Sequence, residues 1–373
     1  MTGSPPGRKG PGTPGIREIA QTLGVSIGTV DRAFHDRPGI SAETRAKVLA
    51  LAEELEYRPN LAARYLSSSK EIRIGVVLPR KIASFWDVVR DGISSAAHPV
   101  RAAGVRVEQR FYPHAGEGEM EAFEQCLAEE VDGLIIASFE PEKAGPFISR
   151  ASARGVPVVC VNTDAPGTAR LTTVAVDPLT NGSLVGELMG RFLRGNGRVV
   201  VITGTLTAVD HARKLQGFRA TTAELWPGLE IGGVVEAHDE EAEAYDKCRQ
   251  LLCEIPEVAG VYVSTANSLP VLDAIRDAGL DGKVTVITTD LFPALAPFLE
   301  SGRVAATIHQ RPWTQGRIAL QALHSFLVDG VRPTPFIELS PNIVMRSNLK
   351  VLLERIQPRA KAAPSKRAPR RGA

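Results

Sequence analysis

The chain has 373 residues, of which 43% are hydrophobic and 23% charged, and its formal net charge is +2. This length is more than one compact core usually serves, so we expect two or three domains of a soluble globular protein. The sequence has no apolar run of the about 20 residues that a membrane helix needs and no secretory signal, so we expect a cytoplasmic protein without a membrane partner. The four cysteines show no metal-ligand spacing, so we expect reduced thiols and no metal.

Charge is distributed unevenly along the chain. Residues 1–70 carry ten Lys/Arg against seven Asp/Glu, residues 71–354 carry 27 against 35, and residues 355–373 carry seven against none. This pattern favours a nucleic-acid contact at an end of the chain and a different ligand in the middle. We expect disordered tails over residues 1–14 and 351–373, the second of them basic enough to attract phosphates non-specifically.

Two short helices joined by a glycine are predicted directly after the first tail. The apolar residues of the first helix recur at i, i+3, i+4 and i+7, which gives it one buried face: Ile16, Ile19, Ala20 and Leu23. Gly24 then suits the left-handed position that ends a helix. Ser26 is expected to cap the second helix, which buries Val30 and Phe34.

A third helix is predicted within residues 39–57. Ser41 is its expected N-cap, and Glu43 favours its first turn. Its inner face consists of Val48, Leu51, Ala52 and Leu55. Three short helices with a tight glycine turn form a helix-turn-helix unit, although the same pattern also fits a small bundle that packs against something else.

The second helix has polar side chains at positions suited to DNA. A helix fits the major groove with its N-terminal residues near the base edges. Arg32 can pair with guanine or a phosphate, and Ser26 and Thr29 can bind phosphates near the positive end of the helix.

Strands and helices alternate from residue 72 onward, which predicts parallel sheets covered by helices. The alternation restarts after residue 172, so two similar α/β units are expected with ligands at the carboxyl ends of strands. The predicted strands are 72–79, 105–113, 131–138 and 156–163 in the first unit, and 172–177, 197–204, 229–237, 258–265 and 284–290 in the second.

Polar residues follow several of these strands. They are Asp164, Asn267, Asp290 and Gln310, while the first strand leads into Ser84, Phe85 and Trp86. Any one of them alone would fit a helix cap or a turn. Together they suit a polyhydroxy ligand, because carboxylates and amides pair with sugar hydroxyls and aromatic faces cover a sugar ring.

The first seventy residues resemble the lac repressor (LacI/GalR) family of bacterial transcription factors. The matching stretches read IREIAQTLGVSIGTVDR, ISAETRAKV and LEYRPNLAARYL. The resemblance implies a DNA contact by a recognition helix and by a hinge helix over residues 60–66: Ser26, Ile27, Gly28, Thr29, Asp31, Arg32, Asn60, Ala63, Arg64 and Leu66. Leu66 would be the apolar wedge that kinks the DNA. Asp31, where the family has serine, and Gly28, which has no side chain, depart from the family pattern.

Residues 72–347 resemble the sensor domain of the same family, a ribose-binding-protein-like type I periplasmic binding fold. The resemblance places the ligand against Phe85, Trp86, Asp164, Lys214, Asn267, Asp290 and Gln310. Ser84 and His211 are expected beside them. Lys214 stands where the family has arginine, so a bidentate contact is lost. A small sugar or polyol is the expected effector.

We therefore predict an α/β regulator with a helix-turn-helix domain (15–59), a hinge (60–70) and a two-lobed core (71–350). Lobe 1 is expected over about 72–171 and 290–328, and lobe 2 over about 172–289 and 329–350. The protein is expected to pair as a homodimer on double-stranded operator DNA, to repress transcription under control of the effector, and to need no cofactor. A dehydrogenase is a rival class, but it lacks GxGxxG and leaves the first seventy residues unexplained. An exported sugar-binding protein is a second rival.

Overall fold

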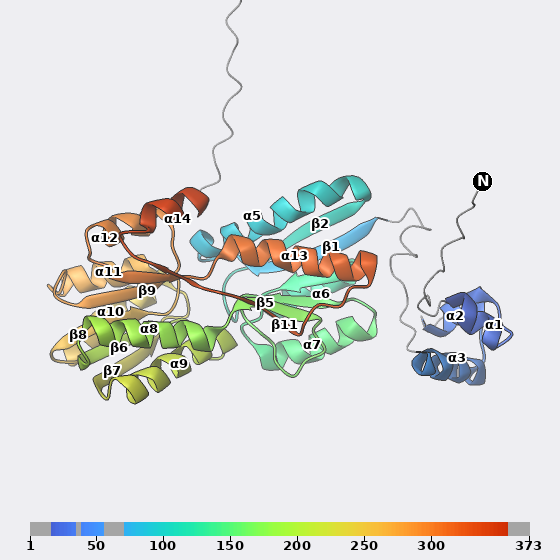
Figure 1. Cartoon of the computed structure of the whole chain (residues 1–373), viewed down its shortest axis with the longest axis horizontal. Coiled ribbons are helices and arrows are strands. Elements are labelled where there is room, and N and C mark those ends of the chain that lie inside the picture. The colour runs from blue at the N-terminus through green and yellow to red at the C-terminus, as the bar shows by residue number, and fades with distance from the viewer. Residues whose placement is uncertain (1–15, 35–38, 56–70, 357–373) are drawn as a thin grey trace, which may run out of the picture. The chain divides into compact units, whose positions relative to one another are not determined.

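The computed structural model describes residues 16–34, 39–55 and 71–356 (Figure 1). The predicted hinge residues Asn60, Ala63, Arg64 and Leu66 lie outside the described residues. The chain divides into two compact units, one of residues 1–70 with 324–331 and one of residues 71–323 with 332–373. No helix in the described part of the chain combines the length and apolar character that a membrane crossing requires.

The N-terminal unit contains α1 (Ile16–Thr22), α2 (Ile27–Phe34) and α3 (Ala42–Glu54). Their shared core consists of Ile19, Ala20, Val30, Ala33, Val48 and Ala52, with Leu23, Leu51 and Leu55 packed against it. It confirms the predicted apolar faces except at Ile16 and Phe34, whose side chains lie outside the described atoms. Gly24 has φ 66°, as its predicted left-handed position requires. Ser26 Oγ accepts from Thr29 N at 3.0 Å and Ser41 Oγ from Thr44 N at 3.0 Å, which confirms both caps.

The first sheet of the core has the strand order β11-β5-β4-β3-β1-β2 and is parallel throughout. Its strands are β1 (Ile72–Pro79), β2 (Val105–Tyr112), β3 (Gly133–Ile136), β4 (Val158–Val161), β5 (Thr172–Val176) and β11 (Phe336–Leu339). The central strands are apolar runs because helices cover both faces of the sheet. These helices are α5 (Ala83–Val100), α6 (Glu119–Ala128), α7 (Pro141–Ala153) and α13 (Pro312–Asp329) (Figure 1).

The second sheet has the order β12-β10-β9-β8-β6-β7, in which the β10–β12 pair is antiparallel. Its strands are β6 (Asn196–Thr203), β7 (Gly228–Glu236), β8 (Val258–Val263), β9 (Thr285–Thr289), β10 (Ala306–His309) and β12 (Asn342–Val344). Its helices are α8 (Pro178–Phe192), α9 (Val209–Leu225), α10 (Glu241–Glu254), α11 (Ser268–Asp277), α12 (Ala296–Glu300) and α14 (Leu349–Ile356).

The predicted lobe boundaries differ from this strand pairing. Strand β5 was assigned by position to lobe 2, but it pairs with β4 and β11 in the first sheet. Strand β10 was assigned to lobe 1, but it pairs with β9 in the second sheet. The chain crosses from one sheet to the other after residues 176, 309 and 339. The alternation of strands and helices in the sequence does not reveal these crossings.

The predicted start of the C-terminal tail at residue 351 also needs correction. Helix α14 continues to Ile356, and its Leu352 and Leu353 pack against the core of the second lobe. Burial of these two leucines stabilises a helical turn that a basic composition alone does not predict.

Helices α8 and α9 cross at close contact, and this crossing fixes the position of Lys214. A Cβ atom on Gly182 of α8 would lie 1.8 Å from the carbonyl oxygen of Lys214, and one on Gly217 of α9 would lie 2.1 Å from that of Leu179. Two glycines therefore permit the backbones to touch. The crossing holds the first two turns of α9 against the carboxyl end of the second sheet.

Candidate functional site

The outer face of α2 is the candidate nucleic-acid surface. Ile27 is 46% exposed, and Gly28 and Arg32 are also exposed, while Thr29 is half-buried. Ser26 Oγ lies 2.9 Å from Thr29 Oγ1, so the two predicted phosphate ligands also bind each other. The side chain of Asp31 lies outside the described atoms. The first turn of α2 thus presents an apolar group and free helix N–H donors at its positive end.

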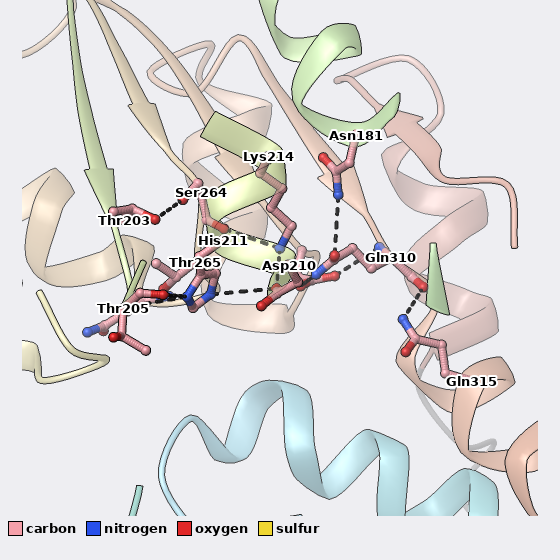
Figure 2. Close-up of polar contacts among 12 residues, drawn as sticks. Asn181, Thr203, Thr205, Asp210, His211, Lys214, Ser264, Thr265, Gln310 and Gln315 are labelled. Atoms are coloured by element: carbon pink, nitrogen blue, oxygen red, sulfur yellow. Dashed lines mark hydrogen bonds and ion pairs between the residues drawn. The ribbon is translucent and has the colours of Figure 1, made fainter. Parts of the chain in front are cut away.

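A buried ion pair on α9 forms the centre of a polar row in the second lobe (Figure 2). Lys214 Nζ donates to Asp210 Oδ2 at 2.9 Å and to the Ser264 carbonyl at 3.4 Å. The two charged side chains are 1% and 3% exposed. They lie on one helix face because they are four residues apart. The His211 Nε2 atom lies 3.7 Å from Asp210 Oδ2.

These neighbours keep the Asp210 carboxylate charged. Burial by itself raises its pKa, but His211 and the Lys214 ammonium together outweigh burial and hold the pKa below its usual value. His211 Nδ1 in turn lies 3.1 Å from the backbone N of Thr205 and 3.2 Å from the Thr205 carbonyl oxygen. Asp210 Oδ1 has no partner although it is buried, so it remains available as an acceptor.

Asp290 and Gln310 form a second buried group at the ends of β9 and β10. Gln310 donates to Asp290 through its backbone N at 2.9 Å and through Nε2 at 2.7 Å. Burial raises the pKa of Asp290 to about 6 against the effect of these two donors. Asn181 Nδ2 lies 3.3 Å from Gln310 Oε1, and Gln315 Nε2 donates to the Gln310 carbonyl at 2.9 Å. Figure 2 shows Asn181 and Gln315 on either side of Gln310.

Asn267 and Asp239 complete the carboxyl end of the second sheet. Asn267 precedes α11, and its Nδ2 is buried without a partner while its backbone N donates to Thr265 Oγ1 at 2.8 Å. Asp239 follows β7 with φ 58°, and its Oδ1 is likewise buried without a partner. Burial raises the pKa of Asp239, and the nearby Asp210 raises it further. His211 opposes both effects.

Asp164 lies in the first lobe and is engaged by its own neighbours. Arg170 donates to both carboxylate oxygens, with Nη2 at 2.8 Å from Oδ2, and Thr173 donates to Oδ1. The two charged side chains are 13% and 16% exposed. A ligand at Asp164 would therefore meet a charge-neutral pair and not a lone carboxylate.

Three aromatic residues of the first lobe pack against one another. Phe85 and Trp86 meet edge to face at 4.9 Å, and Trp86 meets Phe139 at 6.0 Å. All three are buried, whereas Ser84 is exposed. Phe139 was not anticipated from the sequence.

Several polar residues of the site were missed. They are Glu119, Arg170, Asp210 and Asp239. Glu119 accepts from Ser138 Oγ at 2.8 Å and from Phe139 N at 3.1 Å, and burial raises its pKa to about 7. Asp210 was detectable, since it lies four residues before Lys214 in the same predicted helix. Asp239 was also detectable, since it lies two residues after the predicted strand 229–237. Glu119 and Arg170 follow no strand-end pattern that distinguishes them from ordinary surface residues.

Ion pairs join the loops of the two lobes. Lys81, after β1, pairs with Glu240, which precedes α10, and His114 Nε2 lies 3.6 Å from the same carboxylate. Tyr112 is close enough to both Glu119 and Asp239 for each to raise its pKa, although burial is the larger cause. The carboxyl ends of both sheets therefore face one another within this unit.

The arrangement provides hydrogen-bond donors and acceptors in a buried setting. Within residues 16–34, 39–55 and 71–356, no group of three or more His, Cys, Asp or Glu side chains is placed to hold a metal ion. Cys126, Cys160 and Cys248 are buried and Cys253 is exposed, all as free thiols. The chemistry supported by this set of side chains is non-covalent recognition of a polar ligand.

Comparisons with known proteins divide the chain in the same way. Residues 15–60 match the family described as bacterial regulatory proteins, lacI family, and residues 74–330 match the periplasmic binding protein domain family. Catabolite control protein A of Priestia megaterium is 24% identical over 345 residues, covering 90% of this chain and 99% of that protein. The HTH-type transcriptional regulator AglR of Rhizobium meliloti is 28% identical over 331 residues, covering 85% and 89% respectively.

A solved structure resembles the core alone. An ABC transporter solute binding protein from Burkholderia graminis, in complex with D-arabinose, aligns with a TM-score of 0.70 and 25% identity. The alignment covers 76% of this chain and 98% of that chain.

Proposed function

This chain belongs to the lacI family of bacterial regulatory proteins and carries a periplasmic-binding-protein domain. We propose that a small sugar or polyol sets its affinity for operator DNA. The chain is a DNA-binding transcriptional regulator with a sugar-binding type of sensor domain. Repression, a homodimeric state and a cytoplasmic location are part of the proposal. Two helix-turn-helix units on a near-palindromic operator require such a dimer.

The observation that carries the ligand half of the proposal is the set of buried, incompletely paired polar atoms in lobe 2. Asp210 Oδ1, Asp239 Oδ1 and Asn267 Nδ2 each lack a hydrogen-bond partner among the residues that the structure describes. Buried polar atoms are usually hydrogen-bonded, because leaving one unpaired costs about 1–3 kcal/mol. Hydroxyl groups of a bound polyol would supply these partners. The D-arabinose complex of the similar solute binding protein supports the same ligand class.

The DNA half rests on the exposed face of α2 and on the match to residues 15–60. In this proposal Ile27, Thr29 and Arg32 meet the major groove, and Ser26 orients the helix as its cap. Residues 60–66 act as the minor-groove hinge, with Leu66 as the wedge. Ligand closes the lobes and thereby changes the spacing of the two hinges in the dimer.

The experiment measures the two binding activities separately. Purified chain is titrated with its own upstream region in a gel shift, and with D-arabinose, D-glucose and myo-inositol by calorimetry. Arg32→Ala is expected to weaken DNA binding by about 5- to 150-fold, the effect of losing one base contact, while ligand binding is retained. Asp290→Asn is expected to show the reverse pattern. If the parent chain prefers no duplex over random competitor, the regulatory assignment fails.

A further inference from the structure

The cations that touch the candidate ligand site are already paired with carboxylates. Lys214 Nζ lies 2.9 Å from Asp210 Oδ2, and Arg170 Nη2 lies 2.8 Å from Asp164 Oδ2. Each pair is neutral as a unit. The Lys214 ammonium and the Arg170 guanidinium are therefore already balanced before a ligand binds.

Carboxylates without a cationic partner remain on the lobe-2 side. Among the described residues, Asp239 has no ion pair, and Asp290 is held by the uncharged Gln310 with His309 Nδ1 at 3.7 Å. Burial lowers the pKa of His309 to about 4, so this imidazole is neutral at physiological pH. Asp239 and Asp290 therefore place negative charge on the lobe-2 side of the site.

Asp210 and Asp239 both lie near the ring of His211. Asp210 Oδ2 is 3.7 Å from His211 Nε2. A Cβ atom built on Gly204 would lie 2.1 Å from His211 Cε1 and 3.0 Å from Asp239 Oδ1, so the ring and the second carboxylate both approach this glycine. Each carboxylate is at least nine-tenths buried and retains one oxygen without a partner.

We propose that Asp210 and Asp239 together bind two neighbouring hydroxyl groups of an uncharged ligand, and that sugar acids and sugar phosphates are excluded. This inference rests on the proposed ligand site and specifies its charge class. A hydroxyl donates its proton to each unpaired carboxylate oxygen, and the Asn267 Nδ2 donor, also unpaired, meets an oxygen of the same ligand. An acid would place a further negative charge beside Asp239 and Asp290, neither of which forms an ion pair with a lysine or arginine of the described residues.

The test compares matched neutral and anionic probes on the full-length protein at pH 7.5 by calorimetry. The pairs are D-arabinose with D-arabinonate, D-glucose with D-glucuronate and with glucose 6-phosphate, and myo-inositol with its monophosphate; glucosamine provides a cation. We expect at least one neutral probe to bind and its anionic counterpart to bind about 100-fold more weakly or not at all. An anion that binds within tenfold of its neutral counterpart would overturn the inference, as would binding of glucosamine without any neutral probe.

Variants identify the carboxylate responsible. Asp239→Asn is expected to lower the affinity for the neutral probe by about tenfold or more, because a charge-assisted hydrogen bond is lost. It is also expected to reduce the ratio of the neutral probe's affinity to that of its anionic counterpart. Asp246→Asn makes the same charge change at an exposed position of α10 and is expected to alter neither. An Asp239→Asn protein that keeps the parent's affinity and discrimination would contradict the assignment. The probe series on the parent decides the charge class even if this variant does not fold.

The outcomes separate this inference from the proposed function. If no probe of any charge binds, the proposed sugar-sensing function fails and the inference fails with it. If anions bind well, the site remains a ligand site and the charge class alone is wrong.

Discussion

Replacing Lys214 with Met should expose how strongly the buried ion pair constrains the second lobe. The methionine fills much of the lysine's volume, but it leaves the Asp210 carboxylate, 3% exposed, with only His211 close by at 3.7 Å. Removing one partner of a buried pair costs about 3–5 kcal/mol, because the remaining charge stays desolvated. At about 2 °C per kcal/mol for a large domain, we expect the melting temperature to fall by about 6–10 °C.

The pH dependence should change as well. In the parent, the pKa of Asp210 is depressed despite burial, so its stabilising contribution is present above the unfolded pKa and is lost as pH falls. In Lys214→Met the lost ammonium lets burial raise that pKa, so stability is lost instead as pH rises. The difference in unfolding free energy between the parent and Lys214→Met should therefore become smaller at acidic pH.

The assay is thermal unfolding by circular dichroism at several pH values, with urea unfolding followed by tryptophan fluorescence. The matched control is Asp210→Leu with Lys214→Met, which removes both charges and is expected to regain most of the loss, since apolar replacements of buried pairs are often neutral. A single variant that loses less than about 1 kcal/mol, or a double variant no more stable than the single one, would refute this reasoning.

Three further predictions concern other parts of the chain. Burial raises the pKa of Glu119 to about 7, so the parent should lose about 3 kcal/mol of unfolding free energy as pH rises from about 4.5 through 7. Glu119→Gln should not show this loss, and a parent-minus-variant difference in unfolding free energy that stays constant with pH would contradict the prediction. Gly182→Ala places a Cβ 1.8 Å from the Lys214 carbonyl and should sharply lower the melting temperature of the core, whereas Gly145→Ala, whose Cβ meets Thr168 Cγ2 at 3.6 Å, should not. Ser26→Ala removes the cap of α2 and should cost about 1 kcal/mol of stability in the helical unit, with weaker DNA binding in the gel shift; equal melting and binding would show that the cap is dispensable.

The helical unit, and the succession of strands and helices along the chain up to residue 290, were predictable because their signals are local. Periodic apolar residues placed the faces of α1 and α3, and Gly24 and Ser26 marked a helix end and a helix start. Each of these depends on the chemistry of residues within one or two turns. Long apolar strands flanked by helices likewise predicted parallel pairing.

The assignment of strands to lobes was not predictable in this way. Strand β5 and strand β10 each pair with neighbours that a linear division of the chain assigns to the other lobe. Which sheet a strand joins depends on crossovers whose sequence resembles any other strand–helix junction. The same applies to Arg170, which is recognisable as a site residue through its three-dimensional contact with Asp164.

The coupling of ligand binding to DNA binding is the central claim, and one titration tests it directly. Fluorescence anisotropy gives the affinity of the full-length protein for its labelled upstream region with no ligand and with a saturating neutral sugar identified by calorimetry. We expect the affinity to change by about 5- to 150-fold in the parent, the usual range of coupling between two sites, and to stay constant in Asp290→Asn. Identical affinities with and without a sugar that demonstrably binds would contradict the account.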